Sequence, residues 1–145
     1  MKIQYQLSGG GNQVGWQTLA DVTQGDVVKD WNPAASVKVQ NEDLCAMPGQ
    51  LNAAYRQPLG NTREKISIAL SVTKADETTA AAFAMTTRIA LLGSKNDFLV
   101  ILGSSKQLHT NGVCSAVKSN YQGATVEFQI ELETDLVQDG ANIQN

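Results

Sequence analysis

Two segments of the chain alternate strictly between apolar residues and polar or small ones. The first covers residues 66–73 and the second covers residues 126–133. A period of two is typical of a strand that buries one face and turns the other toward solvent or a second element. In the second segment the buried positions are Val126, Phe128, Ile130 and Leu132, and the outward positions are Glu127, Gln129, Glu131 and Glu133.

Directly after the first of these strands the alternation stops and an alanine-rich run begins. Asp76 is a good N-cap, Glu77 places an acidic group in the first turn, and Gly93 is a natural stop after Leu92. These signals predict a helix over residues 77–92. Its apolar side, interrupted by Thr87, consists of Ala80, Phe83, Ala84, Ala90 and Leu91. We expect this helix to pack back on the sheet.

The N-terminal residues predict a hairpin. Ile3, Tyr5 and Leu7 alternate with polar residues, as in a half-buried strand, and the sequence SGGGN at 8–12 predicts a flexible tip. The apolar residues between positions 14 and 19 indicate a returning strand.

The segment after the helix predicts three further strands. FLVIL at 98–102 is apolar on both faces, as in a central strand buried on two sides. A polar strand follows at 106–110, the dipeptide Asn111-Gly112 predicts a turn, and residues 113–118 predict the next strand.

The remaining regions show no clear period. Residues 20–62 contain all three prolines of the chain, and we predict short strands joined by long loops there, in a region that is irregular and loop-rich. Residues 136–145 predict a loose C-terminal tail, or one docked on a neighbouring molecule. A length of 145 residues fits a single domain over residues 1–145. The predicted class is α+β: mainly an antiparallel β-sandwich or barrel with one α-helix packed on the sheet.

Composition narrows the classes of function. Charged residues make up 17% of the chain, the net charge is −3 and the pI is near 5.0. Scattered lysines and arginines on an acidic chain give no reason to expect nucleic-acid binding. No apolar run approaches the roughly 20 residues that span a membrane, and the first residues lack the apolar core of a signal peptide. We therefore expect synthesis in the cytoplasm, and no membrane partner.

Candidate chemistry is sparse, so we expect no enzyme, no catalytic residue, no cofactor and no metal. The single histidine, His109, lies in a polar strand, where we interpret it as a surface or strand residue rather than a zinc ligand or catalytic base. SGGGN lacks the Lys-Ser or Lys-Thr of a phosphate-binding loop. An acidic series allows a calcium site or a carboxylate pair, but the alternation favours a solvated strand face. This series consists of Glu127, Glu131, Glu133 and Asp135.

Cysteines and aromatic residues leave alternatives open. Cys45 and Cys114 are 69 positions apart in no known ligand spacing, and we interpret both as reduced, buried thiols. Three roles are open for Trp16, Trp31 and Tyr55: anchoring loops on the sheet, stacking on a sugar, or serving as interface residues. The anchoring role is favoured.

The block from 59 to 134 carries a family likeness. It contains LGN, an alternating strand, a helix with AAAFA, a short strand and then SAVKSNYQGATVEFQIELET. This layout resembles small tail-associated structural (virion) proteins of tailed bacteriophages and prophages. The resemblance implies a non-catalytic subunit that repeats in a ring around a tail tube, neck or baseplate of a virion, alongside other phage structural proteins.

The leading hypothesis is therefore a tail component that assembles with copies of itself. The alternative is a non-catalytic ligand- or carbohydrate-binding β-module, and the third possibility is a small enzyme that uses His109 or the acidic strand. The glycine tip and two aromatic residues are the candidate interface: Gly9, Gly10, Gly11, Asn12, Trp31 and Tyr55.

Overall fold

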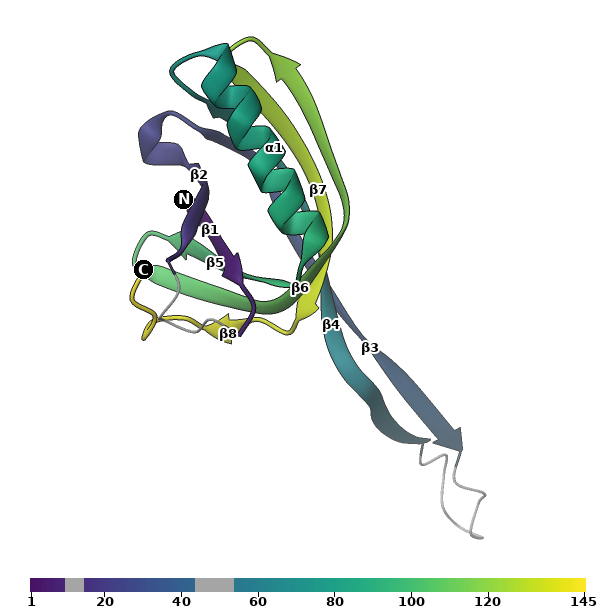
Figure 1. Cartoon of the computed structure of the whole chain (residues 1–145). Coiled ribbons are helices and arrows are strands. Elements are labelled where there is room, and N and C mark those ends of the chain that lie inside the picture. Colours follow the sequence, from purple (N-terminus) through teal and green to yellow (C-terminus); the bar gives the residue numbers. More distant parts are fainter. Residues whose placement is uncertain (10–14, 44–53) are drawn as a thin grey trace, which may run out of the picture.

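The computed structural model describes residues 1–9, 15–43 and 54–145, and for residues 36–43 and 54–62 it describes the backbone alone. The elements, in chain order, are β1 (Lys2–Leu7), β2 (Gln17–Asp21), the 3₁₀ turn η1 (Val22–Gln24), β3 (Val27–Asp43), β4 (Ala54–Thr73), α1 (Glu77–Gly93), β5 (Asn96–Leu102), β6 (Ser105–Gln122), β7 (Thr125–Asp135) and β8 (Gln138–Asp139). Figure 1 shows a body of folded sheet and one helix, from which β3 and β4 project together.

The strands form one connected antiparallel sheet that folds over on itself. Its order is β2-β1-β5-β6-β7-β4-β3, with β8 added beside β6. The long strand β6 belongs to both halves, because residues 105–112 pair with β5 and residues 113–122 pair with β7. Side chains of both halves meet in one core, for example Ile3 and Phe98 from one half and Ile68 and Phe128 from the other. The predicted α+β class with one helix on a sheet is confirmed.

The sandwich alternative fits this arrangement and the barrel alternative does not. The path of paired strands has two ends, β2 and β3, and no ladder joins them within the described parts of the chain. The sheet therefore keeps open edges.

The helix was predicted correctly except for its last turn. The Asp76 carboxylate accepts a hydrogen bond from the Thr79 N–H at 2.7 Å, and the buried side comprises Ala80, Ala84, Thr87 and Leu91. Phe83 packs edge-on against Phe128 of β7, so the helix covers the core face of the sheet (Figure 1).

At its C-terminus the helix ends differently from the glycine stop that the sequence predicts. Gly93 is still helical, and Ser94 leaves the helix in an extended conformation. The last turn is closed by side chains instead, because Ser94 Oγ and Asn96 Nδ2 both donate to the carbonyl oxygen of Ala90 at 3.0 Å.

Two strand predictions need correction. β1 is buried at four consecutive positions, Ile3 to Gln6, while Leu7 is exposed. The face predicted to be solvated is covered too, at Gln4 by Asn145 of the C-terminal tail. The predicted turn at Asn111-Gly112 does not reverse the chain. Asn111 does adopt a positive φ of 54°, but β6 continues through it. β6 is also longer than predicted, because the strands predicted at 106–110 and 113–118 are parts of one strand.

The confirmed strands are those with the clearest patterns. FLVIL lies in β5, which pairs with both β1 and β6 and is buried from Asn96 to Val100. The alternating residues 126–133 lie in β7, and its apolar positions are all buried. The alternation at 66–73 falls in the C-terminal part of β4, where Ile66, Ile68, Leu70 and Val72 are buried. β1 and β2 form the predicted N-terminal hairpin.

Residues 20–62 are more regular than the prediction of short strands and long loops. Apart from η1, the described part of this region is mostly the strand β3 and the first residues of β4, which pair with each other. The C-terminal tail is not loose: it docks on the chain itself. Gln138–Asp139 pair with β6, the Lys106 ammonium donates to the Ile143 carbonyl, and Asn145 Nδ2 donates to Gln4 Oε1.

Candidate assembly surfaces

The projecting β3–β4 hairpin is the most prominent surface feature (Figure 1). Pairing between β4 and β7 runs from Thr73↔Thr125 to Arg63↔Asp135 and stops there. The β3–β4 ladder continues beyond this point, from Lys38↔Leu59 to Asp43↔Ala54. The outer part of the hairpin is therefore a two-stranded ribbon, and an isolated two-stranded ribbon is only marginally stable in water.

The half of the sheet that carries this hairpin has an open edge on each side. Within the described residues, β3 pairs with β4 alone, and residues 113–122 of β6 pair with β7 alone. Pro33 lies in β3 opposite Ile66, a position that fits an edge strand because proline cannot donate to a ladder. Every pair across this half is antiparallel, so β3 and β6 run in opposite directions. Two copies set side by side in the same orientation therefore present antiparallel edges to each other.

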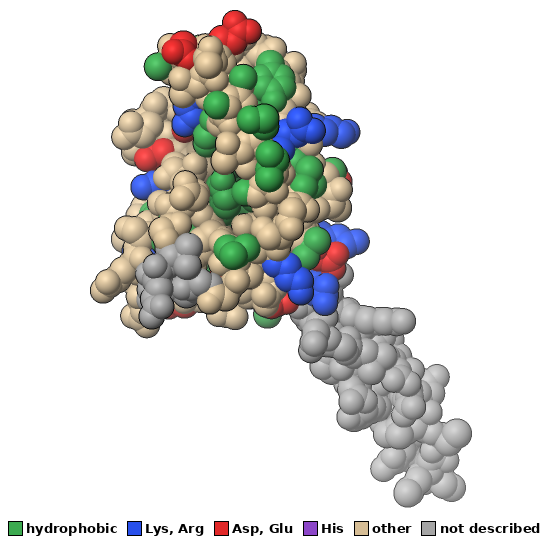
Figure 2. Space-filling model, viewed as in Figure 1, with side chains coloured by type: hydrophobic (Ala, Val, Ile, Leu, Met, Phe, Trp, Pro, Cys, Tyr) green, Lys and Arg blue, Asp and Glu red, His purple; other side chains and the backbone are tan. Residues whose placement is uncertain are grey.

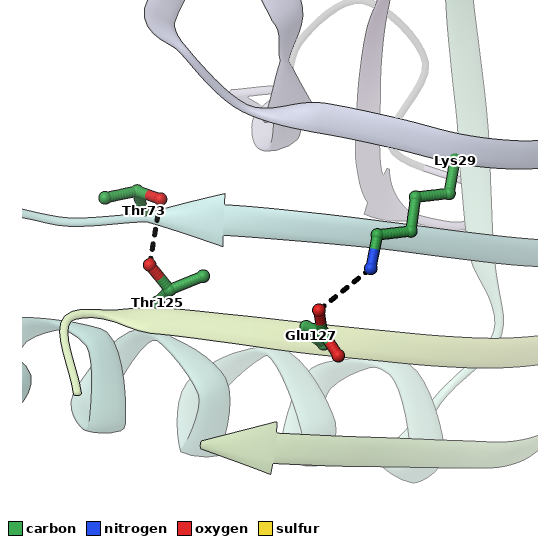
Figure 3. A network of polar contacts seen from close by, with 4 residues as sticks. All are labelled: Lys29, Thr73, Thr125 and Glu127. Carbon is green, nitrogen blue, oxygen red and sulfur yellow. Dashed lines mark hydrogen bonds and ion pairs between the residues drawn. The ribbon is translucent and has the colours of Figure 1, made fainter. Parts of the chain in front are cut away.

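The exposed sheet face between these edges is polar. Lys29 Nζ lies 2.8 Å from Glu127 Oε1, and Thr73 Oγ1 lies 3.1 Å from Thr125 Oγ1 (Figure 3). Asp135 instead accepts a hydrogen bond from Asn111 Nδ2 at 2.7 Å. The acidic series thus spreads along one strand and binds different partners, as a solvated face does. Among the described residues, no group of three or more His, Cys, Asp or Glu side chains is placed to hold a metal ion.

A groove of about 550 Å³ crosses this face near the base of the hairpin. Its charged residues are two cations from β4, Arg63 and Lys65, and two anions from β7, Glu131 and Glu133; Val113 of β6 contributes an apolar wall. Mixed charges of this kind suit contact with another protein surface rather than with a polyanion.

The outward side of α1 is apolar. Met85, Ile89 and Leu92 are 58%, 67% and 50% exposed, and they follow one another at helical spacing. Figure 2 shows hydrophobic side chains gathered over the helix. Within the parts of the chain that the structure describes, no helix is long and apolar enough to cross a membrane.

The single histidine lies in a strand, as predicted, but it is buried and not at the surface. His109 lies in β6 with 1% of its surface exposed, and its Nδ1 is 3.1 Å from Oε2 of Glu64 in β4. This ion-pair contact is not aligned as a hydrogen bond, and Nε2 has no hydrogen-bond partner. The Trp31 ring from β3 contacts the imidazole edge-on, with ring centroids 5.4 Å apart. Burial lowers the pKa of His109, and the nearby Glu64 opposes this effect more weakly.

The candidate interface residues are only partly described. Gly9 is exposed with a φ of 87°, as expected at a hairpin tip, while Gly10, Gly11 and Asn12 lie outside the described residues. Trp31 is half-buried against the core. For Tyr55 the structure gives only the backbone pairing with Glu42. Gly9 and Trp31 are thus the candidates whose side-chain surroundings the structure describes, and the interface role of the whole set stays a prediction.

Cys114 and Trp16, for which the sequence also predicts roles, lie in the body of the protein. Cys114 is a free, buried thiol, and burial raises its pKa to about 11; Cys45 lies outside the described residues. Trp16 is half-buried, with its indole N–H buried and without a hydrogen-bond partner. What sequence reasoning missed is Glu64, because only the fold brings it next to a histidine 45 positions away.

Comparison with known proteins identifies solved structures that share this fold. No protein-family model matches the chain, and no curated protein matches it in sequence. A solved structure of the tail of an empty gene transfer agent particle, refined with C6 symmetry, superposes with a TM-score of 0.54 at 12% identity, over 96% of this chain and 94% of that one. A structure of the virion of the native gene transfer agent particle gives a TM-score of 0.53 at 12% identity, over 94% of both chains. The predicted resemblance to tail-associated structural proteins is thus confirmed at the level of the fold.

Proposed function

We propose that this protein is a structural subunit of a phage tail or tail-like particle and that it acts by assembling with copies of itself. The observation that carries the proposal is the likeness in fold, which extends over nearly the whole length of both chains, to a protein in the tail of a gene transfer agent particle. The role needs no catalytic residue, cofactor or metal. It places the protein in the virion, among other structural proteins.

The open sheet edges support assembly into a ring. Each copy offers two different edges, β3 on one side and residues 113–122 of β6 on the other. Contacts between two different surfaces are heterologous, and they generate a closed ring when the rotation between copies closes. In such a ring, the β3 edge of one copy lies antiparallel beside the β6 edge of the next.

The projecting hairpin supports contacts beyond this lateral one. Because its outer ladder has no further strand beside it within the described residues, we propose that other copies complete its surface. The mixed-charge groove at its base, with Arg63, Lys65, Glu131 and Glu133, is suited to such a contact.

Light scattering over a range of concentrations, with negative-stain electron microscopy of the same samples, tests the proposal. We expect rings or tubes, with six copies per ring if the sixfold symmetry of the gene transfer agent tail applies here. A monomer at every concentration, alone and in the presence of other tail proteins, would contradict it.

Two edge variants test whether the contact is heterologous. Val27→Lys with Asn32→Lys adds charge along the β3 edge, and Val113→Lys with Asn120→Lys adds charge along the β6 edge; all four residues are exposed. Lysines on an edge strand oppose pairing with another strand. We expect each variant to be monomeric and their mixture to form 1:1 dimers, because each retains one intact edge. The control, Gln129→Lys, changes an exposed position on the central strand β7 that does not line the groove and should still assemble.

A further inference from the structure

Three strands contribute side chains to a buried cluster at the base of the hairpin. We call this the root cluster: Trp31 of β3, Glu64 of β4 and His109 of β6. His109 is 1% exposed and Glu64 is 7% exposed. The imidazole touches both partners, with Nδ1 3.1 Å from the Glu64 carboxylate and the Trp31 ring packed edge-on.

Glu64 of the root cluster lies where the hairpin separates from the body. Arg63 is the last residue of β4 that pairs with β7, and Glu64 is the next residue into the body. Beyond Arg63 the hairpin has no partner strand within the described residues. The root cluster therefore links β4 to β6 beside the point where the hairpin leaves the body. It contacts β3 further inside, because Trp31 pairs with Ile68.

The cluster tolerates a neutral imidazole better than a protonated one. A neutral imidazole has one N–H, and when Nδ1 carries it this group lies 3.1 Å from Glu64 Oε2, without the alignment of a hydrogen bond. Protonation adds a second N–H donor at Nε2, which has no hydrogen-bond partner. A buried donor without an acceptor is unfavourable, and burial accordingly lowers the pKa of His109.

Other charged groups on the surrounding strands are engaged elsewhere or point outward. Asp97 of β5 accepts hydrogen bonds from Ser8 Oγ and from the Asn111 N–H, and Asp135 of β7 accepts one from Asn111 Nδ2. The exposed or half-exposed charged residues on these strands are Lys29, Asp30, Arg63, Lys65, Lys106, Glu133 and Asp139. Within the described residues, Glu64 is the charged side chain in contact with His109.

We propose that the root cluster is an acid-sensitive latch, in which protonation of His109 releases the base of the β3–β4 hairpin from β6. The closed form holds a neutral imidazole, and the open form exposes it to water, where its pKa returns to about 6.5. Below that pH the open form binds a proton that the closed form does not. The ratio of open to closed molecules then rises up to tenfold for each unit by which the pH falls, until the pH reaches the lowered pKa of the closed form.

Hydrogen exchange and NMR of the full-length protein test this inference between pH 5.5 and 8. His109 is the single histidine of the chain, so its ring resonance reports the pKa of the closed form directly. Exchange of the amides at residues 28–35 and 63–68, corrected for the intrinsic effect of pH, reports the opening. We expect protection of these amides to fall by up to tenfold per pH unit below about 6.5, while protection of residues 80–91 in α1 stays constant.

The matched control replaces the titrating pair while keeping a ring beside Trp31. In His109→Phe with Glu64→Gln, protection at the hairpin base should not depend on pH over this range. If that variant fails to fold, Glu64→Gln alone serves. It removes the charge that favours the imidazolium, so the fall in protection should extend to lower pH than in the wild type.

Three results would overturn the latch. One is a His109 pKa at or above 6.5 in the folded protein. Another is the same pH dependence of protection in the wild type and in the variants. The third is a loss of protection that begins in α1 and at the hairpin base together, since that would be general unfolding rather than release of the hairpin.

Discussion

Gly112 is the position where the fold excludes a side chain most directly. It lies buried in β6, opposite Asn96 at the start of β5. A Cβ atom added there would lie 2.7 Å from Phe98 Cε2 and 2.8 Å from the backbone carbonyl oxygen of Asn96. Phe98 and Asn96 are only 0% and 2% exposed, so neither neighbour has free space to move into. We predict that Gly112→Ala destabilises the protein.

The magnitude follows from two opposing effects. Overpacking a buried site costs about 1–3 kcal/mol, and the backbone contact places this site toward the upper end. Alanine also restricts the unfolded chain, which offsets about 0.4–1 kcal/mol of that cost. The expected net change is a decrease of about 2 kcal/mol in the free energy of unfolding.

Urea unfolding followed by circular dichroism measures this change. With a slope of about 1–3 kcal/mol per molar urea, the midpoint should fall by roughly 1 M. Several protein concentrations are needed, because assembly raises the apparent stability. Gly93→Ala is the matched control: no atom lies within 4 Å of its added Cβ, and alanine favours the helix by about 1 kcal/mol. An unchanged midpoint for Gly112→Ala, or equal losses in both variants, would refute the reasoning.

Further predictions concern single side chains. The buried Asp26 carboxylate accepts from the backbone N–H groups of Asp21 and Thr73, so Asp26→Ala should lower the unfolding free energy by about 2–4 kcal/mol, with a smaller loss for Asp26→Asn. Asp76→Ala should lower the urea midpoint by removing the cap of α1. The Thr79 N–H lowers the pKa of Asp76, so the cap stabilises above about pH 4 and the difference from wild type should shrink as the pH falls below that value. In a Cys45→Ser variant, Cys114 should react slowly with a thiol reagent at pH 7, and its rate should rise about tenfold per pH unit up to pH 10, because only the thiolate reacts. A rate that levels off near pH 9 would contradict this, because it is the behaviour of an exposed thiol with a pKa of about 8.5.

The elements that could be predicted from the sequence are those with one face in the core. β7 and the C-terminal part of β4 alternate because each contacts the core on one side only, and α1 has capping residues and a buried stripe. β1 was mispredicted because both of its faces are covered. It lies between β2 and β5, and Gln4 is buried while accepting a hydrogen bond from Asn145 at the far end of the chain. Nothing near Gln4 in the sequence indicates that partner.

The projecting hairpin was missed because it leaves the body. A strand shows a clear period only where a core selects its inward residues, and the outer parts of β3 and β4 pair with each other beyond the last β7 contact. Pro33 also argued against a strand, yet an edge strand accepts it. The root cluster could not be predicted from the sequence either. Trp31, Glu64 and His109 are far apart in the chain, and only the arrangement of the strands brings them together.

The open edges are a second, independent reason to regard the body as one part of a larger assembly. An exposed edge of this length invites uncontrolled pairing unless it is bent, charged or covered. β6 presents ten residues of such edge, 113–122, with Lys118 as the single charged residue among them. β3 presents the opposite edge in the orientation that would cover it. The proposed ring would cover both edges of every copy without any further element. A binding module that acts as a monomer would leave both edges open.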